Sequence, residues 1–135
     1  MKKNLKIISG AGINRLSIGL QSSNNNLLKM LGRIHNFEEF LETYKMARKL
    51  GMKNINVDLM IGLPMQTLED VSNDLKKIKK LNPEHISMYS LIVEENTPME
   101  MKIQEGTLKL PSEEIEREEY WLVKQELEKA RIYTL

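Results

Sequence analysis

The stretch that decides the fold is Asn54-Ile55-Asn56-Val57-Asp58-Leu59-Met60-Ile61. Four aliphatic residues alternate here with asparagines, an aspartate and a methionine. Because successive side chains of a strand point to opposite faces, this alternation predicts a strand over residues 54–61. One face of that strand is apolar, and the other carries Asn56, Asp58 and Met60.

Similar patterns continue on both sides of this strand. They predict a strand near 14–20, where Leu16, Ile18 and Leu20 alternate with small or polar residues, and a less regular one near 85–92. Apolar residues at helical spacing predict the intervening elements. The predicted helices lie near 24–31, 37–50, 68–81 and 112–130.

Several residues mark the predicted ends of these elements. Asn36 and Thr67 are expected N-caps, and Gly51 is an expected helix stop. A short helix is expected after Thr97-Pro98. The residues expected on the buried stripe of the last helix are Tyr120, Val123, Leu127 and Ala130. The first residues suggest the end of a helix, and residues 132–135 suggest the start of a further strand.

Strands that alternate with helices are typical of a parallel sheet wrapped by helices. The two faces of the strands differ, which favours a β/α barrel with a ligand in its lumen over a sheet buried on both sides. A closed barrel needs about eight strands. About three parallel strands with flanking helices therefore predict a segment of a partial (β/α) barrel. We expect residues 1–135 to be the middle part of such a domain, with unpaired strand edges.

Composition excludes several classes of function. The 20 basic and 19 acidic residues leave a net charge of +1, which gives no electrostatic footprint for nucleic acid. The sequence has no apolar run of the length that a membrane span requires. It contains no cysteine, so it can form neither disulfides nor a thiolate-held metal site. A cytoplasmic location is the expectation.

Three residues are candidates for a binding site. Gln21 follows the first predicted strand, at the rim where β/α barrels build their sites, although a glutamine there could simply cap a loop. Asp58 lies on the polar face of its strand and needs a partner, either Arg33 or Arg15 or a ligand. Arg33 offers a planar guanidinium that matches a carboxylate, but it could equally be a surface arginine.

Other reactive side chains fit no familiar site. His35 and His85 are 50 residues apart without nearby ligands, so we predict structural roles and no metal site. The serines lack the partners of a nucleophilic triad. Gly62-Leu63-Pro64 has too few glycines for a phosphate-binding loop.

The order of the motifs resembles one family. Residues 14–22 read NRLSIGLQS, 31–35 read LGRIH, and 56–67 read NVDLMIGLPMQT; PEHISMYSL at 83–91, Thr97-Pro98 and Leu108-Lys109-Leu110-Pro111 follow. This series is similar to the oxygen-independent coproporphyrinogen III oxidase family of radical S-adenosylmethionine proteins. Within that family it most resembles the branch of heme chaperones named HemW.

The resemblance implies a fold, cofactors and site residues. Family members have a partial β/α barrel, bind a [4Fe-4S] cluster through three cysteines, and use S-adenosylmethionine as a source of radicals. By resemblance Gln21 contacts that cofactor, Arg33 binds its carboxylate, and Asp58 meets its polar groups. The backbone of Ile92 would meet the adenine. Heme or a porphyrinogen would be the partner molecule of the longer protein.

Two departures qualify these expectations. The cluster cysteines are absent, so the chain alone should be inactive and should hold no cluster. Met65 stands where the family usually has glycine. If that position uses a positive φ, either Met65 is strained or the turn differs. Two rival functions stay open: a non-catalytic module that assembles through its strand edges, and a β/α-barrel enzyme without radical chemistry.

Overall fold

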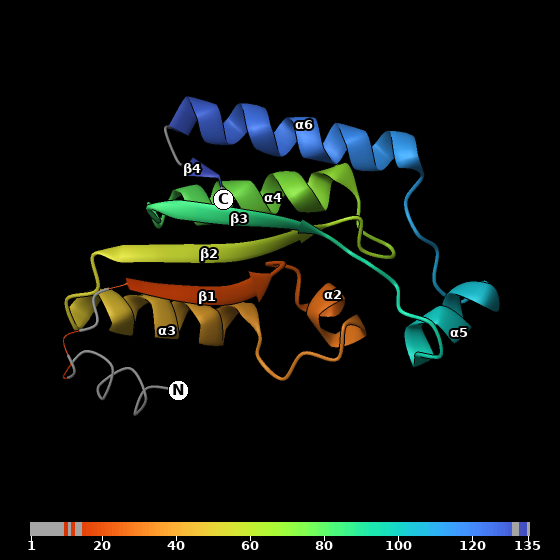
Figure 1. The fold of residues 1–135 in the computed structure, drawn as a ribbon, viewed down its shortest axis with the longest axis horizontal. Coiled ribbons are helices and arrows are strands. Elements are labelled where there is room, and N and C mark those ends of the chain that lie inside the picture. Colours follow the sequence, from red (N-terminus) through yellow and green to blue (C-terminus); the bar gives the residue numbers. More distant parts are fainter. Residues whose placement is uncertain (1–9, 11, 13–14, 131–132, 135) are drawn as a thin grey trace.

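The computed structural model describes residues 10, 12, 15–130 and 133–134 (Figure 1). In this part of the chain four strands form one sheet in the order β1-β2-β3-β4, and each neighbouring pair is parallel. Spatial order therefore follows chain order, with a crossover between each pair of successive strands. This arrangement is a segment of a (β/α) barrel, as the sequence predicted. The strands are β1 (Arg15–Gln21), β2 (Asn54–Ile61), β3 (His85–Ser90) and β4 (Tyr133–Thr134).

The helices divide into two groups. Figure 1 shows α3, α4 and α6 running alongside the strands, whereas α2 and α5 lie beyond the ends to which the strand arrows point. The long helices therefore build the core, and the short ones border the edge where barrels place their sites. Their bounds are α2 (Asn25–Met30), α3 (Phe37–Lys49), α4 (Leu68–Lys79), α5 (Pro98–Gln104) and α6 (Glu113–Ala130).

The core lies between the apolar face of the sheet and the long helices. The four aliphatic residues of β2 are at most 2% exposed, and they share one cluster with Phe40, Leu75 and Val123. Complete burial of such a side chain stabilises a fold by roughly 1.5–3 kcal/mol. The opposite face of the sheet carries the exposed residues Ser17, Gly19 and Tyr89.

The predicted caps are confirmed. The Asn36 side chain accepts a hydrogen bond from the Glu39 amide at 2.8 Å. Thr67 and Asp70 form a reciprocal capping box at the start of α4. Gly51, with φ +92°, ends α3 through bonds from Gly51 N–H to Arg48 and from Met52 N–H to Ala47. These local bonds fix where the crossovers begin and end.

Two predictions about elements are wrong. Strand β3 ends at Ser90 rather than near residue 92, and Ile92 is 82% exposed. Tyr120 was expected on the buried face of α6, but it is 51% exposed, and Glu119 is the buried residue. Val123 and Leu127 set the phase of the helix, and residue 119 lies one turn before Val123. Ala130 is exposed as well.

Some expectations fall at the ends of the chain. The strand β4 pairs with β3 through residues 133 and 134. Ile132, Leu135, Asn14 and the proposed N-terminal helix lie outside the described residues. Among the residues that are described, no helix combines the length and the apolar character needed to cross a membrane.

Candidate functional site

Gln21 closes β1 in an unusual backbone conformation. Its φ is +72°, and the pairing of β1 with β2 shifts register between Gly19 and Gln21. The side chain is 92% buried because it lies against the backbone: a Cβ at Gly19 would be only 3.2 Å from Gln21 Nε2. Glycine at position 19 thus leaves room for the Gln21 amide. Since Gly19 pairs with Asp58, this amide and the Asp58 carboxylate lie on the same face of the sheet.

Asp58 belongs to a polar network that crosses three strands. Its Oδ1 accepts a hydrogen bond from Asn56 Nδ2 at 2.9 Å. The same amide nitrogen donates to Ser17 Oγ at 2.8 Å, and Ser87 Oγ donates to Asn56 Oδ1 at 3.0 Å. Within the described part of the chain, Asp58 has no arginine partner, so an ion pair with Arg15 or Arg33 is not formed. Among the described residues no hydrogen bond to its other oxygen, Oδ2, is formed.

Arg33 is presented by the turn that ends α2. Gly32 takes φ +75°, its N–H bonds to Lys29 O, and the Arg33 N–H bonds to Leu28 O, each at 3.0 Å. This pair of bonds is a Schellman motif, which needs a residue of positive φ at position 32. The Arg33 side chain is exposed and makes no ion pair with any described residue. Its guanidinium is therefore available to donate hydrogen bonds to a carboxylate.

Arg33 and Ile92 line one groove of about 500 Å³. Met60 of β2 also lines this groove, two residues after Asp58 on the same face, which corresponds to roughly 7 Å along the strand. Gln21 and Asp58 are not among the groove residues. The structure thus places the four predicted residues as two pairs, Gln21 with Asp58 on one face of the sheet and Arg33 with Ile92 in the groove that Met60 also lines.

The turn after Gln21 depends on a residue that sequence analysis missed. Asp74 of α4 is 2% exposed and accepts hydrogen bonds from Ser23 N–H at 2.8 Å, Ser23 Oγ at 2.5 Å and Ser22 Oγ at 3.3 Å. Burial raises the pKa of Asp74 to about 6, against the lowering effect of these bonds. A carboxylate on the same helix stripe as Val71 and Ile78 was the signal that could have revealed it.

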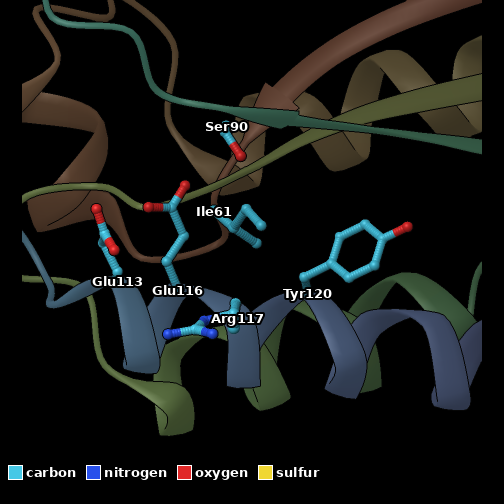
Figure 2. Close-up of a pocket in the computed structure, with 6 residues that line it drawn as sticks. All are labelled: Ile61, Ser90, Glu113, Glu116, Arg117 and Tyr120. Carbon is cyan, nitrogen blue, oxygen red and sulfur yellow. The ribbon is translucent and has the colours of Figure 1, made fainter.

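A second pocket, of about 490 Å³, lies on the helix-covered side of the sheet (Figure 2). Figure 2 shows Ile61 and Ser90 from the strands facing Glu113, Glu116, Arg117 and Tyr120 of α6. A Cβ at Gly62, which has φ +73°, would lie 3.0 Å from Glu116 Oε1. At this pocket, α6 therefore lies close against the end of β2. Nowhere in the described ranges do three potential metal ligands come together.

Glu119 is completely buried close to this pocket. Its Oε2 accepts a hydrogen bond from Gly62 N–H at 3.2 Å, and its Oε1 has no partner among the described residues. Burial raises the pKa of Glu119 to about 7; the Gly62 N–H opposes this effect, and the carboxylates of Glu116, Asp70 and Asp74 add to it. Glu119 is a second buried acid that sequence analysis did not find.

Parallel strands that alternate with helices, with polar side chains toward the carboxyl edge of the sheet, define the segment as part of a (β/α) barrel. The chain matches the Radical SAM superfamily over residues 1–78, and it belongs to that superfamily. This confirms the predicted class.

The chain is also similar in sequence to individual proteins of known name. The chain is 42% identical to the heme chaperone HemW of Bacillus subtilis over 124 residues, which cover 92% of this chain and 33% of that protein. It is 49% identical to HemW of Escherichia coli over 87 residues, covering 64% of this chain and 23% of the relative. The chain therefore spans about a third or less of the length of these curated relatives.

Solved structures agree with the fold. Coproporphyrinogen III oxidase (HemN) from Escherichia coli, a radical SAM enzyme, superimposes with a TM-score of 0.79 at 27% identity, over 96% of this chain and 30% of that one. Elp3 of the archaeon Methanocaldococcus infernus gives a TM-score of 0.77 at 21% identity, which supports the fold alone; the match covers 100% of this chain and 32% of that one. Both matches fit the parallel β/α segment described above.

Proposed function

We propose that residues 1–135 form the middle part of the partial barrel of a HemW-type protein, and that this part holds S-adenosylmethionine. The observation that carries the proposal is that Gln21 and Asp58 share one face of the sheet, while Arg33 and Ile92 line a groove with Met60, two residues after Asp58. Membership of the superfamily and the names of the relatives support it. Heme would be the cargo of the longer protein, and its location would be the cytoplasm.

The available groups fit the cofactor. Since neither group is engaged by another described residue, the exposed Arg33 guanidinium can bind the carboxylate of the methionine part, and Asp58 Oδ2 can accept from hydroxyl or ammonium groups. The Gln21 amide can both donate and accept. The backbone at Ile92 would take the adenine. A [4Fe-4S] cluster would supply electron transfer, but its thiolates would have to come from outside these 135 residues, which contain no cysteine.

A titration of the isolated chain with S-adenosylmethionine tests this proposal. We expect shifts of the backbone amide signals of Gln21, Asp58, Arg33 and Ile92 in NMR spectra, with millimolar affinity because no iron anchors the amino acid part. Arg33→Ala should weaken binding by about tenfold, which is the loss of one charge-assisted contact. Arg117→Ala is the matched control, since Arg117 is exposed and lines the other pocket.

Two results would count against the proposal, and a third would overturn the expected weak affinity. Equal affinities of wild type and Arg33→Ala would remove Arg33 from the site. Shifts centred on the pocket of Figure 2 would move the site to the other face of the sheet. Micromolar affinity by calorimetry would show that the cofactor needs no metal anchor.

The chaperone and the oxidase functions can be separated in a protein that carries this chain together with the three-cysteine motif. The chaperone function predicts heme binding without change to coproporphyrinogen III. The oxidase function predicts oxidative decarboxylation of two propionates to vinyl groups. Incubation of the reduced, anaerobic protein with coproporphyrinogen III decides between them, and formation of product would refute a role as chaperone alone.

A second candidate function is assembly through a sheet edge. β1 is the first strand of the sheet and pairs only with β2 among the described strands, so one edge of its backbone is open to another chain. We expect concentration-dependent self-association in sedimentation velocity experiments if this edge acts as an interface. A stable monomer at all concentrations would exclude edge-driven assembly.

A further inference from the structure

We propose that Asp74 is a positioning residue for the cofactor site: from α4 it holds the turn that carries Gln21 and leads into the helix that presents Arg33. This inference rests on the proposed function above. Asp74 itself is not among the residues predicted to contact the ligand.

The bonds of Asp74 are concentrated on one segment. Its Oδ1 accepts all three hydrogen bonds from Ser22 and Ser23, which lie 52 and 51 positions away in the chain, respectively. Both serines are at least 95% buried. Hydrogen bonds to an ionised acceptor in such a site are stronger than neutral ones. The carboxylate therefore ties the turn after β1 to α4 at one point.

Fixing this turn matters for Gln21. A non-glycine residue at φ +72° is strained and keeps that conformation only where its surroundings impose it. The residues that follow Gln21 directly are the two serines held by Asp74. Without those bonds the backbone at Gln21 could relax, and the amide would leave its place against Gly19.

The same turn also sets the start of α2. Ser22 Oγ accepts a hydrogen bond from the Asn24 N–H at 3.1 Å, and Asn24 caps α2 by accepting one from the Asn26 N–H at 2.9 Å. Asn24 Nδ2 further donates to Asp70 Oδ1 at 3.1 Å. Asp70 and Asp74 are neighbours on one side of α4. Helix α2 is thus anchored to α4 at its beginning and presents Arg33 at its end.

The test compares three variants by the NMR titration with S-adenosylmethionine. Asp74→Ala should lower the affinity by about tenfold and shift the amide signals of Gln21 and Arg33 in the free protein. Asp74→Asn keeps an oxygen that can accept from the serines, so it should restore most of the affinity. Asn73→Ala, at an exposed neighbouring position on α4, should behave like wild type.

A folded Asp74→Ala chain with wild-type affinity and unmoved Gln21 and Arg33 signals would overturn the inference. If Asp74→Ala does not fold, Ser23→Ala removes one of the bonds and should give a smaller loss of affinity; no loss would overturn the inference. If the wild-type chain binds no S-adenosylmethionine, the proposed function fails by itself. The signals of Gln21 and Arg33 in Asp74→Ala would then still decide whether Asp74 positions them.

Discussion

Met65 has a backbone conformation that suits glycine better than methionine. Its φ is +67°, and its N–H donates to Lys109 O at 3.0 Å. The side chain is 59% exposed, so its packing contributes little stability to offset the backbone strain. The family that the sequence resembles usually has glycine at this position. The positive φ confirms the first of the two expected alternatives, a strained Met65.

Replacement of this residue by glycine should stabilise the chain. A non-glycine residue in the left-handed region costs about 1–2 kcal/mol, and the greater freedom of glycine in the unfolded chain offsets part of this gain. We expect Met65→Gly to raise the free energy of unfolding by about 1 kcal/mol in urea denaturation. Met101→Gly is the control, since Met101 is equally exposed but helical and should lose about 1 kcal/mol. A destabilised Met65→Gly chain would show that the strain is absent.

At the level of elements, α6 meets β2 through a buried acid. The folded chain favours the neutral form of Glu119, because burial raises its pKa from 4.5 to about 7. Between these two values the unfolded chain has lost the proton and the folded chain keeps it. The contribution of Glu119 to stability is therefore fully present below about pH 4.5, falls as the pH rises to about 7, and stays low above that.

Glu119→Gln should remove this dependence, since an amide stays neutral and can still accept from the Gly62 N–H. We expect the variant to match wild type near pH 4 and to be more stable at pH 8 by about 1–3 kcal/mol. Urea denaturation at both pH values measures the difference. Glu118→Gln, at an exposed position on the same helix, is the control and should show no such change between the two pH values. Equal stability of Glu119→Gln and wild type at pH 8 would contradict the raised pKa.

The same helix shows what sequence patterns can and cannot predict. The strands, the long helices and the caps at Asn36 and Thr67 follow from alternation, helical period and local hydrogen bonding, and they were predicted. The prediction of the buried face of α6 was wrong at positions 119 and 120, because a carboxylate is rarely placed in a core and an aromatic residue often is. The Gly62 N–H bond and the raised pKa, which favours the neutral form, together make the buried acid tolerable.

The site was predictable to a similar extent. Gln21 was predicted from a strand end, Asp58 from the polar face of a strand, and Arg33 from the residues after a short helix, each together with the family motifs. The structure places them near the carboxyl edge of the sheet. Their binding roles stay predictions. The contacts of Asp74 with the serines join residues more than 50 positions apart, and no local pattern encodes such a contact. The grouping of the four residues as two pairs likewise depends on strand register.

At the scale of the whole molecule, the chain carries the proposed cofactor site but no cysteine ligands for an iron–sulfur cluster. The sheet, the groove and the polar network are all present, yet the 135 residues contain no cysteine. In the described ranges no set of three histidine, aspartate or glutamate side chains could replace the thiolates. Binding of the amino acid part of the cofactor would therefore rest on groups such as Arg33 and Asp58 alone.

Anaerobic reconstitution with iron and sulfide tests this consequence. We expect the desalted chain to retain neither the visible absorbance of an iron–sulfur cluster nor stoichiometric iron, because such clusters are held by cysteine thiolates. A radical SAM protein with the three-cysteine motif, treated in the same way, is the positive control. Retention of a cluster by this chain would mean that other side chains hold the iron. Millimolar binding of S-adenosylmethionine without retained iron would instead show that the chain can bind this cofactor in the absence of a cluster.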